Sequence, residues 1–169
     1  GQAQGVTSIK DLFYQTYGST AKACEDIAAA GYSGIEIFDG NLAEYANDPD
    51  SFKSLLSKHK LELVSVYTGA NFIYNDILVD EFHKIKQAIA FAKSMGAINL
   101  IVGGGAKRST GTTEEDFQML AKGLDQVTDL AAAAGLTACY HPHLTTIVET
   151  TADLDKIMSL SKVHFCPDT

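Results

Sequence analysis

The sequence has few cysteines and no pairing pattern among them. Cys24, Cys139 and Cys166 are the three cysteines in 169 residues, they lie far apart, and none belongs to a CxxC motif. An odd number without short spacing indicates neither a disulfide framework nor a zinc ribbon. The chain also lacks any apolar stretch close to the roughly 20 residues that a membrane-spanning helix needs. We therefore expect three small buried cysteines and no membrane partner.

Positive charge is also scarce. The chain has 13 Lys and Arg against 21 Asp and Glu, which gives a formal charge of -8. No cluster of basic residues stands out, whereas nucleic-acid affinity depends mainly on neutralising phosphates. The glycines at Gly103, Gly104 and Gly105 follow neither of the spacings GxGxxG and GxxxxGK[ST] that cradle nucleotide phosphates. We expect no nucleic-acid partner and no nucleotide cofactor.

Length and composition predict one folded domain over residues 1–169. With 46% hydrophobic residues the chain can bury a sizeable core, and no low-complexity linker divides it. The first residues, Gly-Gln-Ala-Gln, resemble the remainder of a tag followed by a polar segment left after a leader is removed. We therefore expect an exported or periplasmic location rather than a cytoplasmic one.

Short β-rich runs alternate with longer helical runs along the chain. Cap and stop residues such as Ser19, Pro49, Gly96 and Gly135 bound the helical runs, and Thr112-Thr113-Glu114-Glu115 has the composition of a capping box. Helices are predicted over residues 21–30, 49–59, 79–95, 112–134 and 150–160. Strands are predicted over residues 12–15, 34–38, 61–67, 98–105, 136–141 and 163–168.

Strands separated by helices of this length imply parallel βαβ units. The regular spacing favours a (β/α)8 TIM barrel, although a doubly wound open sheet has the same local pattern. Such a barrel takes about 250 residues. We therefore expect an α/β chain that covers six strands of a TIM barrel and is incomplete at its C-terminus. The other strands would come from a longer chain or from a second chain, so a homo-oligomer is one of the possibilities.

Polar side chains gather where the predicted strands end, which is where parallel α/β proteins bind their substrates. We expect substrate contacts from Gln15, Asn71, Lys107 and His141. Glu36 lies inside an apolar strand, and a buried carboxylate is costly without a partner. It is therefore either neutralised by a neighbouring donor or used as a substrate ligand or catalytic acid/base.

Two histidines follow the fifth predicted strand. Cys139, His141 and His143 share one face if the strand continues past Pro142. Imidazole and carboxylate groups are common ligands of transition metals, so this pattern indicates a metal or substrate contact, with structural hydrogen bonding as the alternative. Asp168 ends the sixth strand as a second candidate, or it caps a following helix.

The order of "GYSGIEIF", "LELVSVYTGANF", "GAINLIVGGG", "GLTACYHPHLTTIVETTADLDKIM" and "VHFCPDT" resembles the xylose isomerase-like TIM-barrel superfamily of sugar phosphate isomerases and epimerases. Within it, the resemblance is to the branch that includes inosose dehydratases. It implies a divalent metal (Mn, Co, Zn or Mg) held by carboxylate and histidine side chains at the ends of strands five to eight. Asp168 matches the strand-six ligand. For strand five, either His141 replaces the usual Glu or Glu149 reaches in from the loop; Glu149 also has the position of a carboxylate that stabilises a helix N-terminus.

The resemblance implies a metal-dependent isomerase, epimerase or dehydratase that acts on a sugar or keto-polyol. Such an enzyme removes the proton next to a metal-polarised carbonyl. The candidate catalytic groups are Glu149, His143 and Glu36. Two alternatives remain: a non-catalytic sugar-binding or partner module on the same barrel, and an apurinic endonuclease-like phosphodiesterase, which the acidic charge disfavours.

Overall fold

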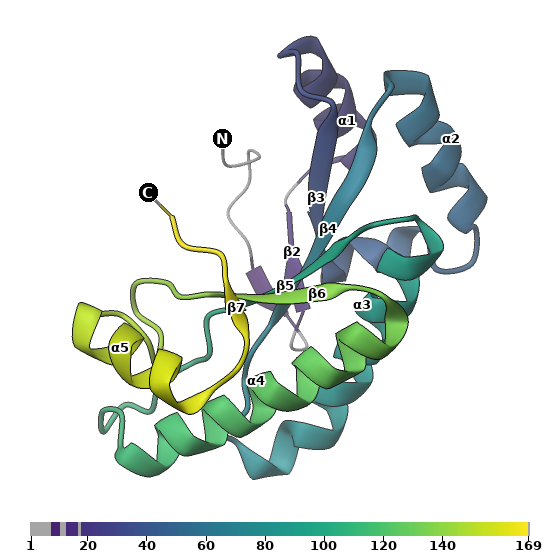
Figure 1. Ribbon diagram of the computed structural model, residues 1–169. Helices are drawn as coiled ribbons and strands as arrows, with labels where there is room; N and C mark the ends of the chain where they lie inside the picture. The colour runs from purple at the N-terminus through teal and green to yellow at the C-terminus, as the bar shows by residue number, and fades with distance from the viewer. Residues whose placement is uncertain (1–7, 11–12, 17, 169) are drawn as a thin grey trace.

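The computed structural model describes residues 8–10, 13–16 and 18–168. Five strands lie side by side in one parallel sheet, in the order β3, β4, β5, β6 and β7 (Figure 1). Their order in space follows their order in the chain, which confirms the predicted succession of βαβ units. The strands are β3 (Gly34–Phe38), β4 (Glu62–Gly69), β5 (Asn99–Gly103), β6 (Thr137–His141) and β7 (His164–Phe165).

A helix precedes each of these strands. Helix α3 packs on β4 and β5, α4 packs on β6, and the two helices contact each other. None of the helices in the described part of the chain is long and apolar enough to cross a membrane. The helices are α1 (Thr20–Ala29), α2 (Pro49–His59), α3 (Leu78–Ser94), α4 (Glu114–Ala134) and α5 (Thr151–Leu160), with short 3-10 helices η1 (Asp39–Glu44) and η2 (Asn75–Ile77).

The predicted capping box of α4 is displaced by one residue. The N-cap is Thr113, whose hydroxyl accepts from the backbone N–H of Asp116, while the Asp116 carboxylate accepts from the Thr113 backbone. A carboxylate three residues after the N-cap can reach back to it, and Asp116 replaces the Glu115 that the pattern suggested. The helix consequently begins at Glu114.

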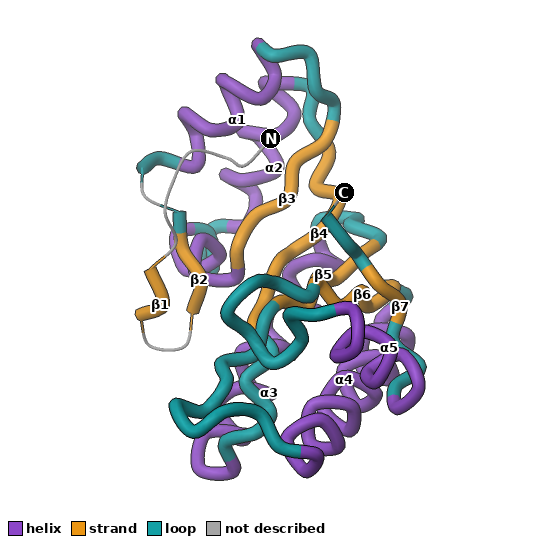
Figure 2. Tube along the Cα trace, turned by 90° about the vertical axis from the view of Figure 1, so that its left-hand side faces the viewer, coloured by secondary structure: helices purple, strands orange, loops and turns teal. Residues whose placement is uncertain are grey.

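The prediction of a parallel strand over residues 12–15 is wrong in its pairing. Residues Phe13–Gln15 (β2) pair antiparallel with β1 (Ser8–Lys10), and Leu12 lies outside the described residues. Figure 2 shows this hairpin beside β3. The Tyr14 backbone N–H donates to Asp39 Oδ1 at 2.9 Å, so a side chain, rather than a strand ladder, attaches the hairpin to the sheet.

The two faces of the sheet differ in composition, because residues paired in register point to the same side. One face packs under the helices and forms the apolar core, for example with Ile35, Ile37 and Leu100. We call the other the inner face. Its side chains come from all five strands and from the residues that follow β7, and include Glu36, Phe38, Ser65, Tyr67, Ile101, Cys139, His141, His164 and Cys166.

The cysteine prediction is confirmed for one residue of the three. Cys24 is fully buried, whereas Cys139 and Cys166 are half-buried, and all three are free thiols. In the described part of the chain, no helix packs on the inner face as α3 and α4 do on the other, and its two cysteines keep some solvent contact.

Candidate active site on the inner face

A row of aromatic rings crosses the inner face at the carboxyl ends of the strands. The centroid of the Tyr67 ring lies 5.2 Å from that of Tyr14, 5.2 Å from that of Phe38 and 6.0 Å from that of His141. All three contacts are edge-to-face. Desolvation raises the pKa of Tyr14 to about 12 and raises that of Tyr67 as well. Both phenols therefore stay protonated near neutral pH, and the row offers apolar surface with hydroxyl groups at its edges.

The row is continuous because Gly103 has no side chain. A Cβ at Gly103 would overlap the Tyr67 hydroxyl oxygen, and Gly103 pairs in register with His141. Tyr67 thus extends across β5 toward β6. No signal in the sequence indicates this contact, since three consecutive glycines are equally typical of a bend.

Changing Gly103 to Ala is expected to displace the Tyr67 ring and to lower the free energy of unfolding by about 1–3 kcal/mol, the usual cost of overpacking. Urea unfolding measures the loss. In a Tyr67→Leu background the ring is gone, so the same Gly103→Ala change is expected to cost much less. Equal costs in both backgrounds would contradict the contact.

The His141 ring is held in one tautomer. Its Nδ1 lies 2.8 Å from the backbone carbonyl oxygen of Cys166, and a carbonyl can only accept, so Nδ1 carries the proton. The neutral ring therefore has an unprotonated Nε2, which lies 3.9 Å from Asp168 Oδ2. This arrangement is typical of a histidine that binds a metal or takes up a proton. The predicted pair of His141 and Asp168 is brought together.

Glu36 lies on the same face and has a partner. The Ser65 hydroxyl donates to Glu36 Oε2. Desolvation raises the pKa of the Glu36 carboxyl, while the Ser65 hydrogen bond and the proximity of His141 oppose that rise. The Glu36 side chain nevertheless remains exposed. Glu36 is thus held by a neighbouring donor and also faces the space beside His141.

His143 lies beyond the strand. Strand β6 ends at His141, so the alternation does not continue through Pro142. The His143 side chain is exposed, its Nδ1 lies 3.0 Å from the Leu144 carbonyl oxygen, and its ring centroid lies 5.8 Å from that of His141. The two rings are therefore neighbours although only one of them belongs to the sheet.

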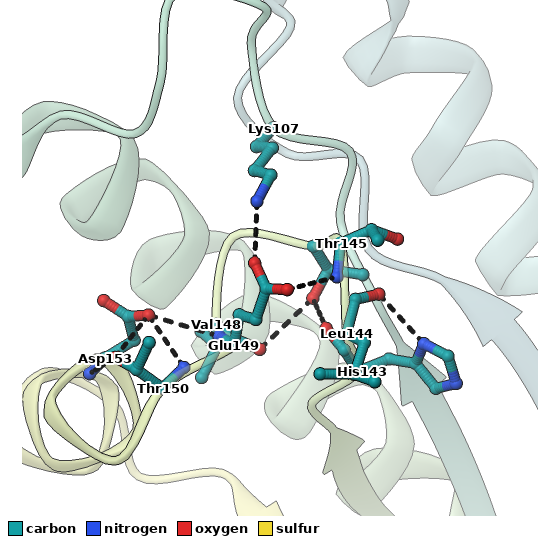
Figure 3. Close-up of polar contacts among 9 residues, drawn as sticks. Lys107, His143, Leu144, Thr145, Val148, Glu149, Thr150 and Asp153 are labelled. Atoms are coloured by element: carbon teal, nitrogen blue, oxygen red, sulfur yellow. Dashed lines mark hydrogen bonds and ion pairs between the residues drawn. The ribbon is translucent and has the colours of Figure 1, made fainter.

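Glu149 and Lys107 contact each other rather than His141 (Figure 3). Lys107 Nζ lies 2.7 Å from Glu149 Oε2, and the Thr145 backbone N–H donates to Glu149 Oε1 at 3.1 Å. These contacts, first of all the one with Lys107, lower the pKa of the Glu149 carboxyl. The carboxylate therefore joins the loop after β5 to the loop after β6.

The remaining two predicted contacts lie in different surroundings. Asn71 is buried; its amide nitrogen lies 3.3 Å from Glu81 Oε1 and its oxygen accepts from the Ala106 backbone N–H at 3.1 Å. Gln15, at the end of β2, is exposed. Asn71 thus fixes the loops around the site, while Gln15 is free to contact a molecule bound over the hairpin.

A buried group of charges under these loops escaped the prediction from sequence. Lys84 Nζ lies 2.9 Å from Glu81 Oε2 and 3.8 Å from Asp39 Oδ2, and the three side chains are 3%, 0% and 1% exposed. Thr68 also donates to Asp39 at 2.7 Å. One signal was present in the sequence, because Glu81 and Lys84 share the α3 face of the apolar residue Ile85.

The described residues do not complete a metal site. Among them, no group of three or more His, Cys, Asp and Glu side chains could hold a metal ion. His141 and Asp168 supply two donors, whereas protein metal sites commonly use three or four. Glu149 is engaged with Lys107 and Thr145.

The parallel sheet, its helices and the polar groups at the strand ends are those of the β/α-barrel class of proteins, and the comparison with known families specifies it. The chain matches the family described as xylose isomerase-like TIM barrel over residues 24–169, and it belongs to that family. The predicted TIM-barrel fold is thereby confirmed.

Among curated proteins, the chain is similar to inosose dehydratases. It is 29% identical over 163 residues to the enzyme of Lacticaseibacillus casei, covering 88% of this chain and 53% of that protein. It is 31% identical over 159 residues to inosose dehydratase 1 of Bacillus cereus, covering 85% and 51%. The chain thus spans about half the length of the curated relatives it matches.

Solved structures share the fold at lower identity. The probable 3-DHS dehydratase of Bacillus anthracis has a TM-score of 0.71 at 15% identity, covering 90% of this chain and 58% of that chain. The 3-keto-D-glucoside 4-epimerase of E. coli has a TM-score of 0.70 at 18% identity, covering 91% and 65%. The IOLI protein, solved with a bound zinc atom, has a TM-score of 0.67 at 18% identity, covering 83% and 54%.

Proposed function

We propose that the protein to which this chain belongs is a divalent-metal-dependent isomerase, epimerase or dehydratase of a sugar or keto-polyol. The observation that carries the proposal is His141, whose Nδ1 proton is fixed by the Cys166 carbonyl and whose Nε2 faces Asp168. The similarity to inosose dehydratases and to a keto-glucoside epimerase supports the substrate class. The zinc atom of one solved relative supports a divalent metal.

Of the two possibilities for the strand-five metal ligand, we propose His141. Glu149 already accepts hydrogen bonds from Lys107 and from Thr145. In His141 the Nδ1 proton is donated to the Cys166 carbonyl, which leaves the lone pair of Nε2 for a metal ion. The further ligands would come from outside the described residues. A divalent ion in this family's site supplies Lewis-acid polarisation of a substrate oxygen.

The side chains of this chain would bind the substrate and move its proton. Glu36, held by Ser65 and with a raised pKa, is our candidate for the base that takes the proton next to the carbonyl. His143 is the candidate acid at the edge of the site. The aromatic row of Tyr14, Phe38 and Tyr67 would contact the C–H face of the substrate, and Gln15 and Lys107 its outer hydroxyl groups.

Metal titration of the full-length protein by calorimetry tests the proposal. His141→Gln and Asp168→Asn are each expected to weaken Zn²⁺ or Mn²⁺ binding by at least about 10-fold, since even supporting residues of metal sites contribute 10- to 100-fold. His83→Gln, at an exposed position of α3, is the matched control and should bind like the wild type.

Absence of metal binding in a well-folded full-length protein would instead favour a non-catalytic sugar-binding module. The incomplete ligand set of the described residues is the observation behind that second candidate. Metal binding that neither His141→Gln nor Asp168→Asn weakens would reject our ligand assignment.

A further inference from the structure

The loop after β6 contains a residue in an uncommon backbone conformation. Thr145 has a φ of 68°, in the left-handed region. A β-branched side chain rarely adopts this region, because its Cβ substituents crowd the backbone. Lys60, the other non-glycine residue with positive φ in the described part of the chain, is the C-cap of α2, where that conformation is ordinary. Thr145 ends no helix, so its conformation needs another cause.

Side chains and backbone from two loops hold Thr145 in place. Glu149 Oε1 accepts from the Thr145 backbone N–H at 3.1 Å, and Lys107 fixes the other carboxylate oxygen at 2.7 Å (Figure 3). On the C-terminal side of Thr145, Ala106 pairs with Thr146 in an isolated bridge, and the Ile147 backbone N–H donates to the Gly105 carbonyl at 3.1 Å. The Glu149 carboxylate thus contacts both loops, Lys107 in one and Thr145 in the other.

The turn at Thr145 determines where His143 lies. The next residue, Thr146, folds back and donates both its backbone N–H, at 3.2 Å, and its hydroxyl, at 2.6 Å, to the His143 carbonyl. The His143 Nδ1 contacts the Leu144 carbonyl within the same turn. His143 is therefore held from its C-terminal side by a turn whose conformation depends on Thr145.

Stabilisation of helix α5 does not account for Glu149. The N-terminus of this helix is capped by Thr150 and Asp153, and the Asp153 carboxylate accepts from the backbone N–H groups of Glu149 and Thr150. The negative charge of Asp153 acts to raise the pKa of the Glu149 carboxyl, but the contact with Lys107 lowers it more, so the pKa is lowered overall. The carboxylate is directed away from the helix, toward Lys107 and Thr145 (Figure 3).

We propose that Glu149 is a positioning residue that, together with Lys107, holds Thr145 in the left-handed conformation and thereby keeps the His143 ring beside His141. This proposal rests on the proposed function for the use of His143, but the contacts themselves do not depend on it. Glu149 acts through the loop and touches neither substrate nor metal.

Amide hydrogen exchange of the full-length protein, labelled with ¹⁵N-threonine, tests the clamp. Glu149→Ala removes the acceptor and is expected to raise the exchange rate of the Thr145 amide by about 10-fold or more, the loss of one hydrogen bond to a charged group. Glu149→Gln keeps an acceptor oxygen and should stay within about threefold of the wild type. Lys107→Met leaves the carboxylate but frees its other oxygen, and should give an intermediate rate.

Glycine provides the rescue. Glycine adopts positive φ without steric cost, so Thr145→Gly in the Glu149→Ala background should restore the single set of His143 ring signals that Glu149→Ala alone broadens or splits. A residue that merely stabilised the fold would show no such recovery. Unchanged Thr145 exchange and unchanged His143 signals in Glu149→Ala would overturn the proposal.

Turnover separates the clamp from the proposed function. If the amide and ring effects appear and kcat falls with them, both proposals are supported. If they appear while kcat stays at the wild-type value, the clamp is supported and His143 loses its catalytic assignment. Should Glu149→Ala fail to fold, Glu149→Gln and Lys107→Met still give the comparison, and equal exchange rates in these two would reject the clamp.

Discussion

Replacing Glu36 with Gln is expected to slow removal of the proton next to the substrate carbonyl by about 10²- to 10⁴-fold, the usual contribution of a general base. Gln has nearly the same shape and can still accept from the Ser65 hydroxyl, but it cannot take up a proton. The effect should therefore appear in kcat with little change in fold stability. Proton NMR of a keto-polyol in D₂O measures the step directly, as exchange of the α-proton for deuterium.

The matched control is Glu62→Gln. Glu62 is exposed and begins β4, at the end of the strand away from the candidate site. It should leave the exchange rate unchanged. An exchange rate of Glu36→Gln within about threefold of the wild type would remove Glu36 as the base, because loss of a general base costs at least about 100-fold. The metal ligands proposed above would be unaffected by that result.

Replacing Lys84 with Met is expected to lower the free energy of unfolding by about 3–5 kcal/mol, because removal of one partner leaves buried charges uncompensated. Lys84 is the cation between Glu81 and Asp39, and all three side chains are almost fully buried. Met keeps the length of the side chain and loses the charge. Urea unfolding measures the difference, with Lys86→Met, at an exposed position of α3, as the control.

The loss should depend on pH in a definite direction. Burial already raises the pKa of Asp39 in the folded protein, and Lys84 is the largest influence that lowers it. Without Lys84 the folded pKa rises further, so the folded state binds a proton more readily than the unfolded chain, whose Asp pKa is about 3.9. The loss in the free energy of unfolding is therefore largest above the folded pKa of Asp39 in the variant, and it shrinks as pH falls toward the pKa of Asp in the unfolded chain. A deficit that grows on acidification would contradict the buried pairing.

These two predictions concern two layers around the candidate site, the face of the sheet where substrate would bind and the buried charges beneath the surrounding loops. Glu36 faces the inner side of the sheet, where the proposed chemistry takes place, while Lys84 lies beneath the loops that surround it. Through Asn71, Glu81 contacts the loop after β5, and through Tyr14, Asp39 contacts the hairpin. The buried charges therefore fix the loops and the hairpin relative to the sheet.

The sequence by itself determined the alternation of strands and helices and most of their limits. The helix predicted over residues 49–59 is α2 (Pro49–His59), and the helix predicted to end at Ala134 does so before Gly135. Periodicity, caps and glycine stops are local signals, so they can be recognised along the chain. The carboxyl end of β6 could also be located, and with it His141, whereas the strand predicted over residues 163–168 is shorter, because β7 ends at Phe165, before Asp168.

Tertiary structure alone decided which polar groups meet. Lys107 and Glu149 are 42 residues apart, and the hairpin pairs with itself rather than with β3. Lys84 and Glu81 fall within the helix predicted over residues 79–95, and only the packing of that helix buries them beside Asp39. Such contacts depend on how helices pack and how loops turn at the edge of the sheet, and the energies that select them come from burial and long-range pairing. A local pattern contains neither, which is why the elements could be predicted while the partners of Glu149 and Lys84 could not.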